Sequence, residues 1–254
     1  MKKTSSNITP DGTIILNRDD KFFNFLFKKA KSYKLKTISF GKHIKSDVRL
    51  KKVIKKKDFS KISVQIRDQI LNFNIKEINV YNVLASLALL YLLKIDFKKI
   101  RLNLEKFEPS EGRGKKYFIK RYKKKFRFID ESYNANPLSV KNAINRLNLI
   151  NKEKCKKYLV LGDMLELGSK SKKYHEEISR VINNSDIDKV FVKGKKTIFT
   201  YKHLNKNKRG NILQNIEDID ANLSQWISNN DYLMIKGSNA TGLNDFSKSI
   251  IRGN

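Results

Sequence analysis

Apolar and polar residues in the first forty positions follow the pattern of a strand, a helix and a second strand. The runs Gly12–Asn17 and Thr37–Phe40 predict the strands. Between them, Asp19 or Asp20 is expected to cap the helix. The apolar face of that helix consists of Phe22, Phe23, Leu26 and Phe27. This order predicts a parallel α/β unit.

In the next segment, the spacing between apolar residues changes. From Val48 to Asn74, apolar residues alternate weakly with polar ones, which predicts antiparallel strands with exposed basic faces. The segment Ile78–Leu93 is apolar almost all round, so as a helix it is expected to be buried on most sides. Its most apolar part, residues 83–93, is about half of the ~20 residues that a membrane span needs. Membrane insertion is therefore not expected.

A break rich in proline and glycine lies within the segment Phe107–Lys116. Beyond it the pattern alternates regularly between strand and helix. The strands are expected at 126–130, 157–161, 189–192 and 232–235, and the helices near 139–149, 172–183, 216–228 and 243–251. This order predicts a parallel sheet with helices on both faces, which binds ligands at the carboxyl ends of its strands.

Three of these strand ends carry polar or glycine-containing motifs. They are Asp130–Pro137 (DESYNANP), Gly162–Gly168 (GDMLELG) and Lys236-Gly237-Ser238. Asp130 can accept the hydroxyls of a ribose. Tyr133, Asn134 and Asn136 lie in the loop that follows. They either line a ligand site or form an Asx-type turn before Pro137.

The second motif offers Asp163 and Glu166, whose carboxylates can orient a cationic group of a substrate. His175 follows on the next helix. Because it stands beside Glu176 and Glu177, its simplest interpretation is a surface residue.

Three further residues are candidates outside those motifs. Asn79 and Asn82 project from one helix face, and a carboxamide can recognise the edge of an adenine. The simpler interpretation is a helix cap. Arg113, between two glycines, can bind phosphate oxygens or be a solvated charge.

The turn Gly194-Lys195-Lys196-Thr197 resembles the end of a phosphate loop. The first glycine of that motif would fall at position 189, which is Lys189. The sequence therefore contains no phosphate loop.

Composition adds a strong charge to this picture. Lys and Arg number 55 against 25 Asp and Glu, a net charge of +30, while 39% of the residues are apolar. The apolar content predicts a folded protein, and the charge suggests nucleic acid as one alternative partner. Because the lysines are spread over most of the chain, solvated lysine-rich faces explain the charge more simply.

Cysteine and histidine give no sign of a disulfide or a metal centre. Cys155 is the single cysteine, and His43, His175 and His203 lie far apart with no ligand spacing. No signal peptide is apparent in the polar segment 1–9. A cytoplasmic location is expected.

Taken together, the ordered motifs resemble the Mur ligases. They are GTIILNRDD at Gly12, NVYN at Asn79, EGRG at Glu111, DESYNANP at Asp130, LGDMLELG at Leu161 followed by His175, and IKGS at Ile235. DESYNANP with LGDMLELG resembles the branch that adds D-alanyl-D-alanine to a UDP-N-acetylmuramoyl tripeptide. The resemblance covers essentially the whole chain.

The resemblance implies a fold and a reaction. Residues 1–107 are expected to be the later part of a central ATPase domain of mixed sheet and helices, and residues 108–254 a Rossmann-like C-terminal domain with a parallel sheet. ATP, with Mg²⁺, phosphorylates a carboxylate in this family, and an incoming amine attacks the acyl phosphate to form an amide.

The resemblance also implies roles for individual residues. Asn79 and Asn82 would contact adenine, Arg113 the phosphates and Asp130 the ribose. The residues that would line the dipeptide cleft are Tyr133, Asn134, Asn136, Asp163, Glu166, His175, Lys236, Gly237 and Ser238.

Departures from the family pattern limit what this chain is expected to do alone. The UDP-sugar domain, phosphate loop, metal ligands and carbamylated lysine of the family have no match here, so no catalytic or metal-binding residue is assigned. Ile78 replaces a histidine and Asn239 an arginine of the pattern. The isolated chain is expected not to ligate.

Two explanations of these departures stay open, a truncated gene product and one half of a split ligase with a separately encoded N-terminal half. A non-catalytic nucleotide- or peptide-binding module and a basic nucleic-acid-binding protein are the alternatives. An open sheet edge and apolar face near 14–16 and 84–90 would bind a partner or make the isolated chain poorly soluble.

Overall fold

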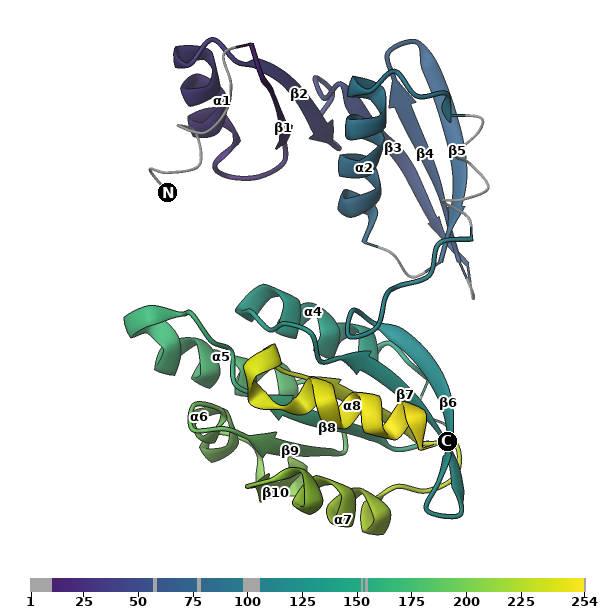
Figure 1. The fold of residues 1–254 in the computed structure, drawn as a ribbon, viewed down its shortest axis with the longest axis vertical. Helices are drawn as coiled ribbons and strands as arrows, with labels where there is room; N and C mark the ends of the chain where they lie inside the picture. Colours follow the sequence, from purple (N-terminus) through teal and green to yellow (C-terminus); the bar gives the residue numbers. More distant parts are fainter. Residues whose placement is uncertain are drawn as a thin grey trace. The chain divides into compact units, whose positions relative to one another are not determined.

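The computed structural model describes residues 11–56, 59–76, 79–97, 106–151, 153 and 155–253. The chain divides into two compact units, residues 1–108 and 109–254. Both are α/β units built on a mixed sheet, as the α/β fold class predicted (Figure 1).

The first unit has a sheet in the order β1-β2-β3-β4-β5. Its elements are β1 (Thr13–Asn17), α1 (Phe23–Ser32), β2 (Lys36–Gly41), β3 (Val48–Lys55), β4 (Ser60–Ile66), β5 (Gln69–Ile75) and α2 (Val80–Leu92). β1 to β3 pair in parallel, and β3 to β5 are antiparallel, which confirms both predictions for this segment.

Two expectations for this unit are wrong. Neither Asp19 nor Asp20 is the N-cap residue of α1, which is Phe22. Asp20 Oδ1 accepts the N–H of Phe22 at 2.8 Å just before the helix, whereas Asp19 accepts the backbone N–H groups of Lys42 and His43. The helix predicted over Ile78–Leu93 was expected to be buried on most sides, but α2 is buried on one face only. Position 78 itself lies outside the described residues.

The buried face of α2 packs on the sheet of the first unit, over β1, β2 and β3. Leu84 and Leu87 are fully buried in the same core as Phe40 of β2 and Val48 of β3, so the apolar face expected near residues 84–90 is largely covered. Leu89, on another side of the helix, is 47% exposed. Among the described residues, β1 pairs with β2 alone and forms the expected open edge.

The second unit has a six-stranded sheet in the order β10-β9-β8-β11-β7-β6. Its strands are β6 (Lys115–Arg121), β7 (Lys124–Glu131), β8 (Lys157–Gly162), β9 (Lys189–Lys193), β10 (Arg209–Leu213) and β11 (Tyr232–Lys236). Its helices are α4 (Pro137–Asn148), α5 (Ser171–Asn183), α6 (Thr197–Lys202), α7 (Ile216–Trp226) and α8 (Leu243–Arg252), with single 3₁₀ turns at Gly168–Lys170, Lys206–Lys208 and Asn239–Thr241.

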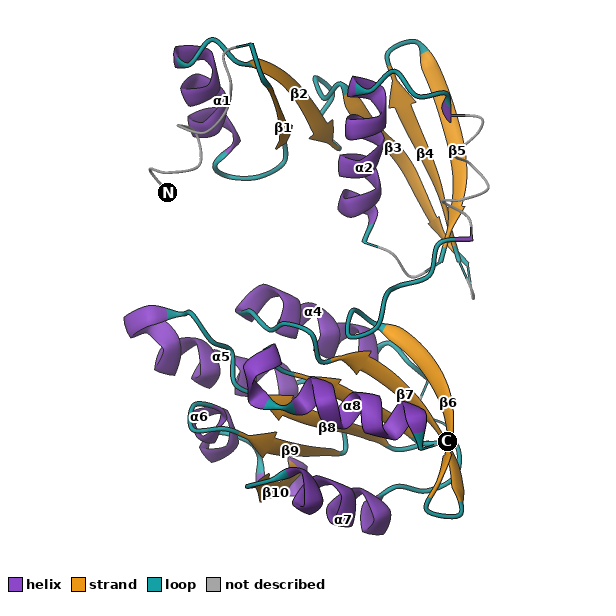
Figure 2. Cartoon of the chain, viewed as in Figure 1, coloured by secondary structure: helices purple, strands orange, loops and turns teal. Residues whose placement is uncertain are grey.

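All four predicted strands and four predicted helices are confirmed here. The sheet is not wholly parallel, however, because β6 pairs antiparallel with β7 at one edge. β6, β10 and α6 were not predicted. Two cores form on the two faces of the sheet, one under α4 and α5 and the other under α7 and α8 (Figure 2).

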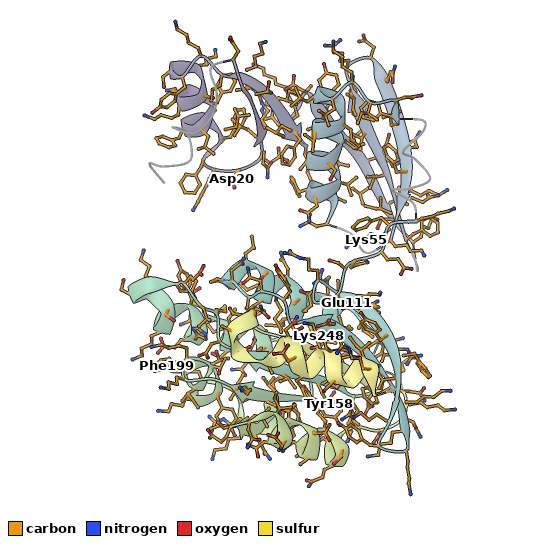
Figure 3. All side chains as sticks on the ribbon, in the orientation of Figure 1. Asp20, Lys55, Glu111, Tyr158, Phe199 and Lys248 are labelled. Atoms are coloured by element: carbon orange, nitrogen blue, oxygen red, sulfur yellow. The ribbon has the colours of Figure 1, made fainter. Side chains whose placement is uncertain are left out.

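Aromatic side chains fill the second of these cores. Tyr158, labelled in Figure 3, is fully buried and donates its hydroxyl to the Trp226 carbonyl at 2.8 Å. The Trp226 ring meets Phe191 edge-on, with ring centroids 6.1 Å apart. Within the described ranges, no helix is both long and apolar enough to cross a membrane.

Candidate functional site

The three polar motifs lie at the carboxyl ends of adjacent parallel strands. β8, β11 and β7 are neighbours in the sheet, and their registers bring Leu161, Lys236 and Glu131 side by side. The loops that follow these strands are therefore next to one another. Such an edge is where open α/β sheets bind their ligands.

Asp130 ties the first of these loops to the segment before β6. Its buried carboxylate accepts hydrogen bonds from Gly112 N (2.7 Å), Ser132 N (3.2 Å) and Ser132 Oγ (2.6 Å). Gly112 has φ +71°, and a Cβ atom there would lie 2.7 Å from the Cβ of Tyr133. Asp130 thus shapes the loop that carries Arg113.

Lys236 binds the same loop from β11. Its ammonium is buried, lies 3.5 Å from Glu131 Oε2 and donates to the Asn134 carbonyl. Arg146 of α4 pairs with the other oxygen of Glu131. Burial lowers the pKa of Lys236, and the Glu131 carboxylate offsets part of that effect. Sequence reasoning missed Glu131 and Arg146, although Glu131 stands inside the DESYNANP motif.

The side chain of Asp163 is bound by the turn Gly194–Thr197, the turn that resembles the end of a phosphate loop. Its carboxylate accepts from Lys196 N at 3.0 Å and from Thr197 N at 2.7 Å, and a Cβ atom at Gly194 would clash with it at 2.4 Å. The N–H groups of Lys196 and Thr197 thus bind the Asp163 carboxylate, where a phosphate loop would bind a phosphate. In this structure Asp163 is buried and joins two loops.

The interpretation of His175 as a surface residue is wrong, because its side chain is fully buried. Nε2 accepts the N–H of Met164 at 3.1 Å, and Nδ1 faces the Ser171 carbonyl at 2.8 Å. A backbone N–H only donates and a carbonyl only accepts, so the ring is neutral with its proton on Nδ1. Burial lowers the pKa of His175 and favours the same form.

Ser238 and Gly237 connect the third loop to the other two. Ser238 Oγ accepts from Leu165 N at 3.1 Å, and Ser238 N donates to the Asp163 carbonyl. A Cβ atom at Gly237 would lie 2.9 Å from Leu243 Cδ1 and 3.1 Å from the Cα of Gly162, so this close approach leaves little room for a larger residue. Asn244 of α8 adds a 3.2 Å bond to Ser132 Oγ.

Other predicted residues face solvent. The guanidinium of Arg113 lies 4.4 Å from the ring centroid of Tyr133, and both side chains are exposed. Asn136 caps α4 in a capping box with Ser139, and Pro137 is the first residue of that helix. Asn134 is exposed.

Glu166 is exposed at φ +61°, at the tip of its loop. Carboxylate, carboxamide and guanidinium groups are therefore presented around the same three strand ends, which suits a small zwitterionic ligand.

The remaining candidates, Asn79 and Asn82, lie in the first unit. Asn79 caps α2 through its Oδ1, which accepts Tyr81 N at 2.9 Å, and Asn82 is exposed one turn further on. Across the described part of the chain, no three His, Cys, Asp or Glu side chains gather into a metal site.

Comparison with known proteins gives two family matches. Residues 2–90 match the Mur ligase middle domain, and residues 118–239 match the Mur ligase glutamate ligase domain. A UDP-N-acetylmuramoyl-tripeptide–D-alanyl-D-alanine ligase of Buchnera aphidicola is 27% identical over 97% of this chain and 53% of its own length. The Bacillus subtilis ligase of the same name is 34% identical over 48% of this chain and 27% of its own length.

Solved structures agree at the level of the fold. The MurF ligase of Thermotoga maritima in complex with ADP superposes with a TM-score of 0.73 at 22% identity, over 97% of this chain and 55% of that one. A folylpolyglutamate synthase of the same organism gives 0.64 at 13% identity, over 97% and 56%. The curated ligases that match nearly all of this chain are about twice as long, so the chain spans about half of their length.

Proposed function

The chain belongs to the Mur ligase family, and from that premise we propose that it supplies the nucleotide- and dipeptide-binding residues of an ATP-dependent ligase. The reaction joins D-alanyl-D-alanine to a UDP-N-acetylmuramoyl tripeptide in peptidoglycan synthesis. Relatives named for this reaction match up to 97% of the chain, which supports the choice of substrates.

One observation carries the dipeptide part of the proposal. Three loops at adjacent strand ends are bonded to one another through buried Lys236 and Ser238, and they present exposed Asn134 and Glu166. Buried Asp163 and His175 bond the second loop to the turn before α6 and to α5. D-Alanyl-D-alanine has an ammonium and a carboxylate, so a nearby carboxylate and a carboxamide suit its two ends. The buried members position the loops, and the exposed members contact the ligand.

The nucleotide part rests on fewer contacts. We assign Asn82 to the adenine and Arg113 to the phosphates because both side chains are exposed. Asn79 retains its amide N–H groups for the adenine while its oxygen caps α2. The Asp130 oxygens already accept three bonds from the chain, so its contact with a ribose would add to or replace one of them.

The chemical step needs groups beyond those seen here. Phosphoryl transfer to a carboxylate requires a cradle for the phosphates and a metal, whereas the sequence has no phosphate-loop motif and the described residues hold no metal-ligand cluster. A polypeptide of these 254 residues alone is therefore expected to bind but not to ligate.

The binding test uses the isotope-labelled full chain. Titration with D-alanyl-D-alanine is expected to shift the amide resonances of Asn134, Leu165 and Glu166, and L-alanyl-L-alanine serves as the control. Glu166→Gln should weaken binding about tenfold if the carboxylate meets the ammonium. Absence of any dipeptide-dependent shift would refute the dipeptide part of the proposal.

A ligation assay separates the alternatives. ATP-dependent amide formation by the chain alone would contradict the expected incompetence. Activity that appears only with a separate polypeptide bearing the phosphate loop and the UDP-sugar domain would indicate a split ligase. Dipeptide or ADP binding without activity in either case would favour a non-catalytic module.

A further inference from the structure

We propose that His175 is a positioning residue that acts as a latch on the GDMLELG loop, holding Leu165 and Glu166 in place through an uncharged ring. The inference rests on the proposed function only for the identity of the ligand at the loop tip. The latch itself follows from contacts within the second unit.

The loop is fixed at three consecutive residues by three different segments. The carboxylate of Asp163 is held by the turn before α6, the N–H of Met164 by His175 on α5, and the N–H of Leu165 by Ser238 after β11. The loop therefore cannot move at Met164 without breaking the bond to His175.

The tip changes direction immediately after these anchors. Met164 is buried at 1% exposure, whereas Leu165 is 39% exposed and Glu166 adopts φ +61°. A left-handed backbone at a non-glycine residue is unfavourable and persists only where its surroundings hold it. Of the three anchors, His175 is the one that a proton converts from a hydrogen-bond acceptor into a donor.

Protonation would abolish the latch. An added proton on Nε2 would face the Met164 N–H, so donor would meet donor, and the charge would be buried. The charged groups that act on the ring from neighbouring segments are Asp163, which favours the cation, and Lys196, which opposes it. Burial outweighs the attraction to Asp163.

Two substitutions of His175 distinguish the role of Nε2 from that of Nδ1. His175→Gln places an amide oxygen near the Nε2 position and can still accept from Met164 N, whereas His175→Asn retains a donor near Nδ1 for Ser171 but loses that acceptor. His203→Gln is the matched control, because Nδ1 of this exposed histidine also faces the carbonyl four residues earlier, at 2.8 Å from Phe199 O.

The experiment measures amide hydrogen exchange at Met164 and Leu165 in the full chain. His175→Asn should speed exchange about tenfold, while His175→Gln and His203→Gln should stay within about threefold of wild type. Equal behaviour of the Gln and Asn variants, or unchanged exchange in His175→Asn, would overturn the latch.

The wild-type protein gives a second test if a variant fails to fold. Its His175 ring nitrogen shifts should report the Nδ1–H tautomer at neutral pH, and Met164 exchange, corrected for its intrinsic rate, should rise as the pH falls and the ring becomes charged. The Nε2–H tautomer would refute the latch. If the latch tests succeed and D-alanyl-D-alanine does not bind, the proposed function fails and the latch stands.

Discussion

Two tyrosines at the edge of the second sheet differ in the hydrogen bonding of their hydroxyl groups. The hydroxyl of Tyr122 donates to Asp220 at 2.5 Å. The buried hydroxyl of Tyr117 has no hydrogen-bond partner among the residues that the structure describes. Burial, with the nearby charges of Glu111 and Asp130, raises the pKa of Tyr117 to about 12, so it is neutral at physiological pH.

Tyr117→Phe is therefore expected to stabilise the protein by about 1 kcal/mol, because it removes a buried polar group that lacks a bond. Tyr122→Phe should destabilise it by about 1 to 2 kcal/mol, because it leaves Asp220 without that donor. Urea unfolding of both variants measures the difference. Equal destabilisation by the two substitutions would show that the Tyr117 hydroxyl is satisfied in solution.

A second residue-scale prediction concerns acid. The folded-state pKa of His175 lies below its unfolded value of 6.5, so the unfolded chain binds the proton more readily. Its contribution to stability is complete above about pH 6.5 and is lost as the pH falls through the folded pKa. The free energy of unfolding of His175→Gln should vary less with pH below about 6.5 than that of wild type. A parallel pH dependence in the two proteins would contradict this.

At the scale of elements, the β6–β7 hairpin is joined by a two-residue turn of a kind that favours glycine. Tyr122 and Lys123 have φ values of +55° and +56°. Positive φ at both central positions defines the type I′ turn, which matches the twist of paired strands. Lysine at the second position is thus unfavourable.

Lys123→Gly is expected to stabilise the protein by about 1 kcal/mol, since glycine adopts this conformation without strain. Lys125→Gly, an exposed position on β7, should have the opposite sign because glycine weakens a strand. Thermal unfolding of the pair tests the turn. Destabilisation by Lys123→Gly would mean that the turn differs in solution.

Sequence periodicity was sufficient for most elements and insufficient for contacts between distant segments. β6 was missed because the exposed Phe118 stands between Tyr117 and the buried Ile119, so three apolar residues in a row hide the alternation. His175 was misread from its acidic neighbours, although it shares a helix face with Ile178 and Ile182. The bond from Asp163 to Thr197 spans 34 positions, and no local pattern predicts it.

For the whole molecule, the net charge of +30 means that like charges repel one another across its lysine-rich faces. Raising NaCl from about 0.05 to 0.5 M screens this repulsion and should raise the Tm by several degrees. A variant with Lys51, Lys55, Lys61 and Lys125 changed to Gln, all exposed positions, should show a smaller rise. A Tm that falls with salt would indicate that attractive ion pairs dominate.

Trp226 is the single tryptophan of the chain, and it is partly buried against a core of the second unit. Its intrinsic fluorescence therefore reports on residues 109–254, while the first unit contributes no such emission. Circular dichroism detects the helices of both units. A denaturation experiment recorded with both signals would reveal whether the two units lose their structure in one transition or in two, without any dye or label.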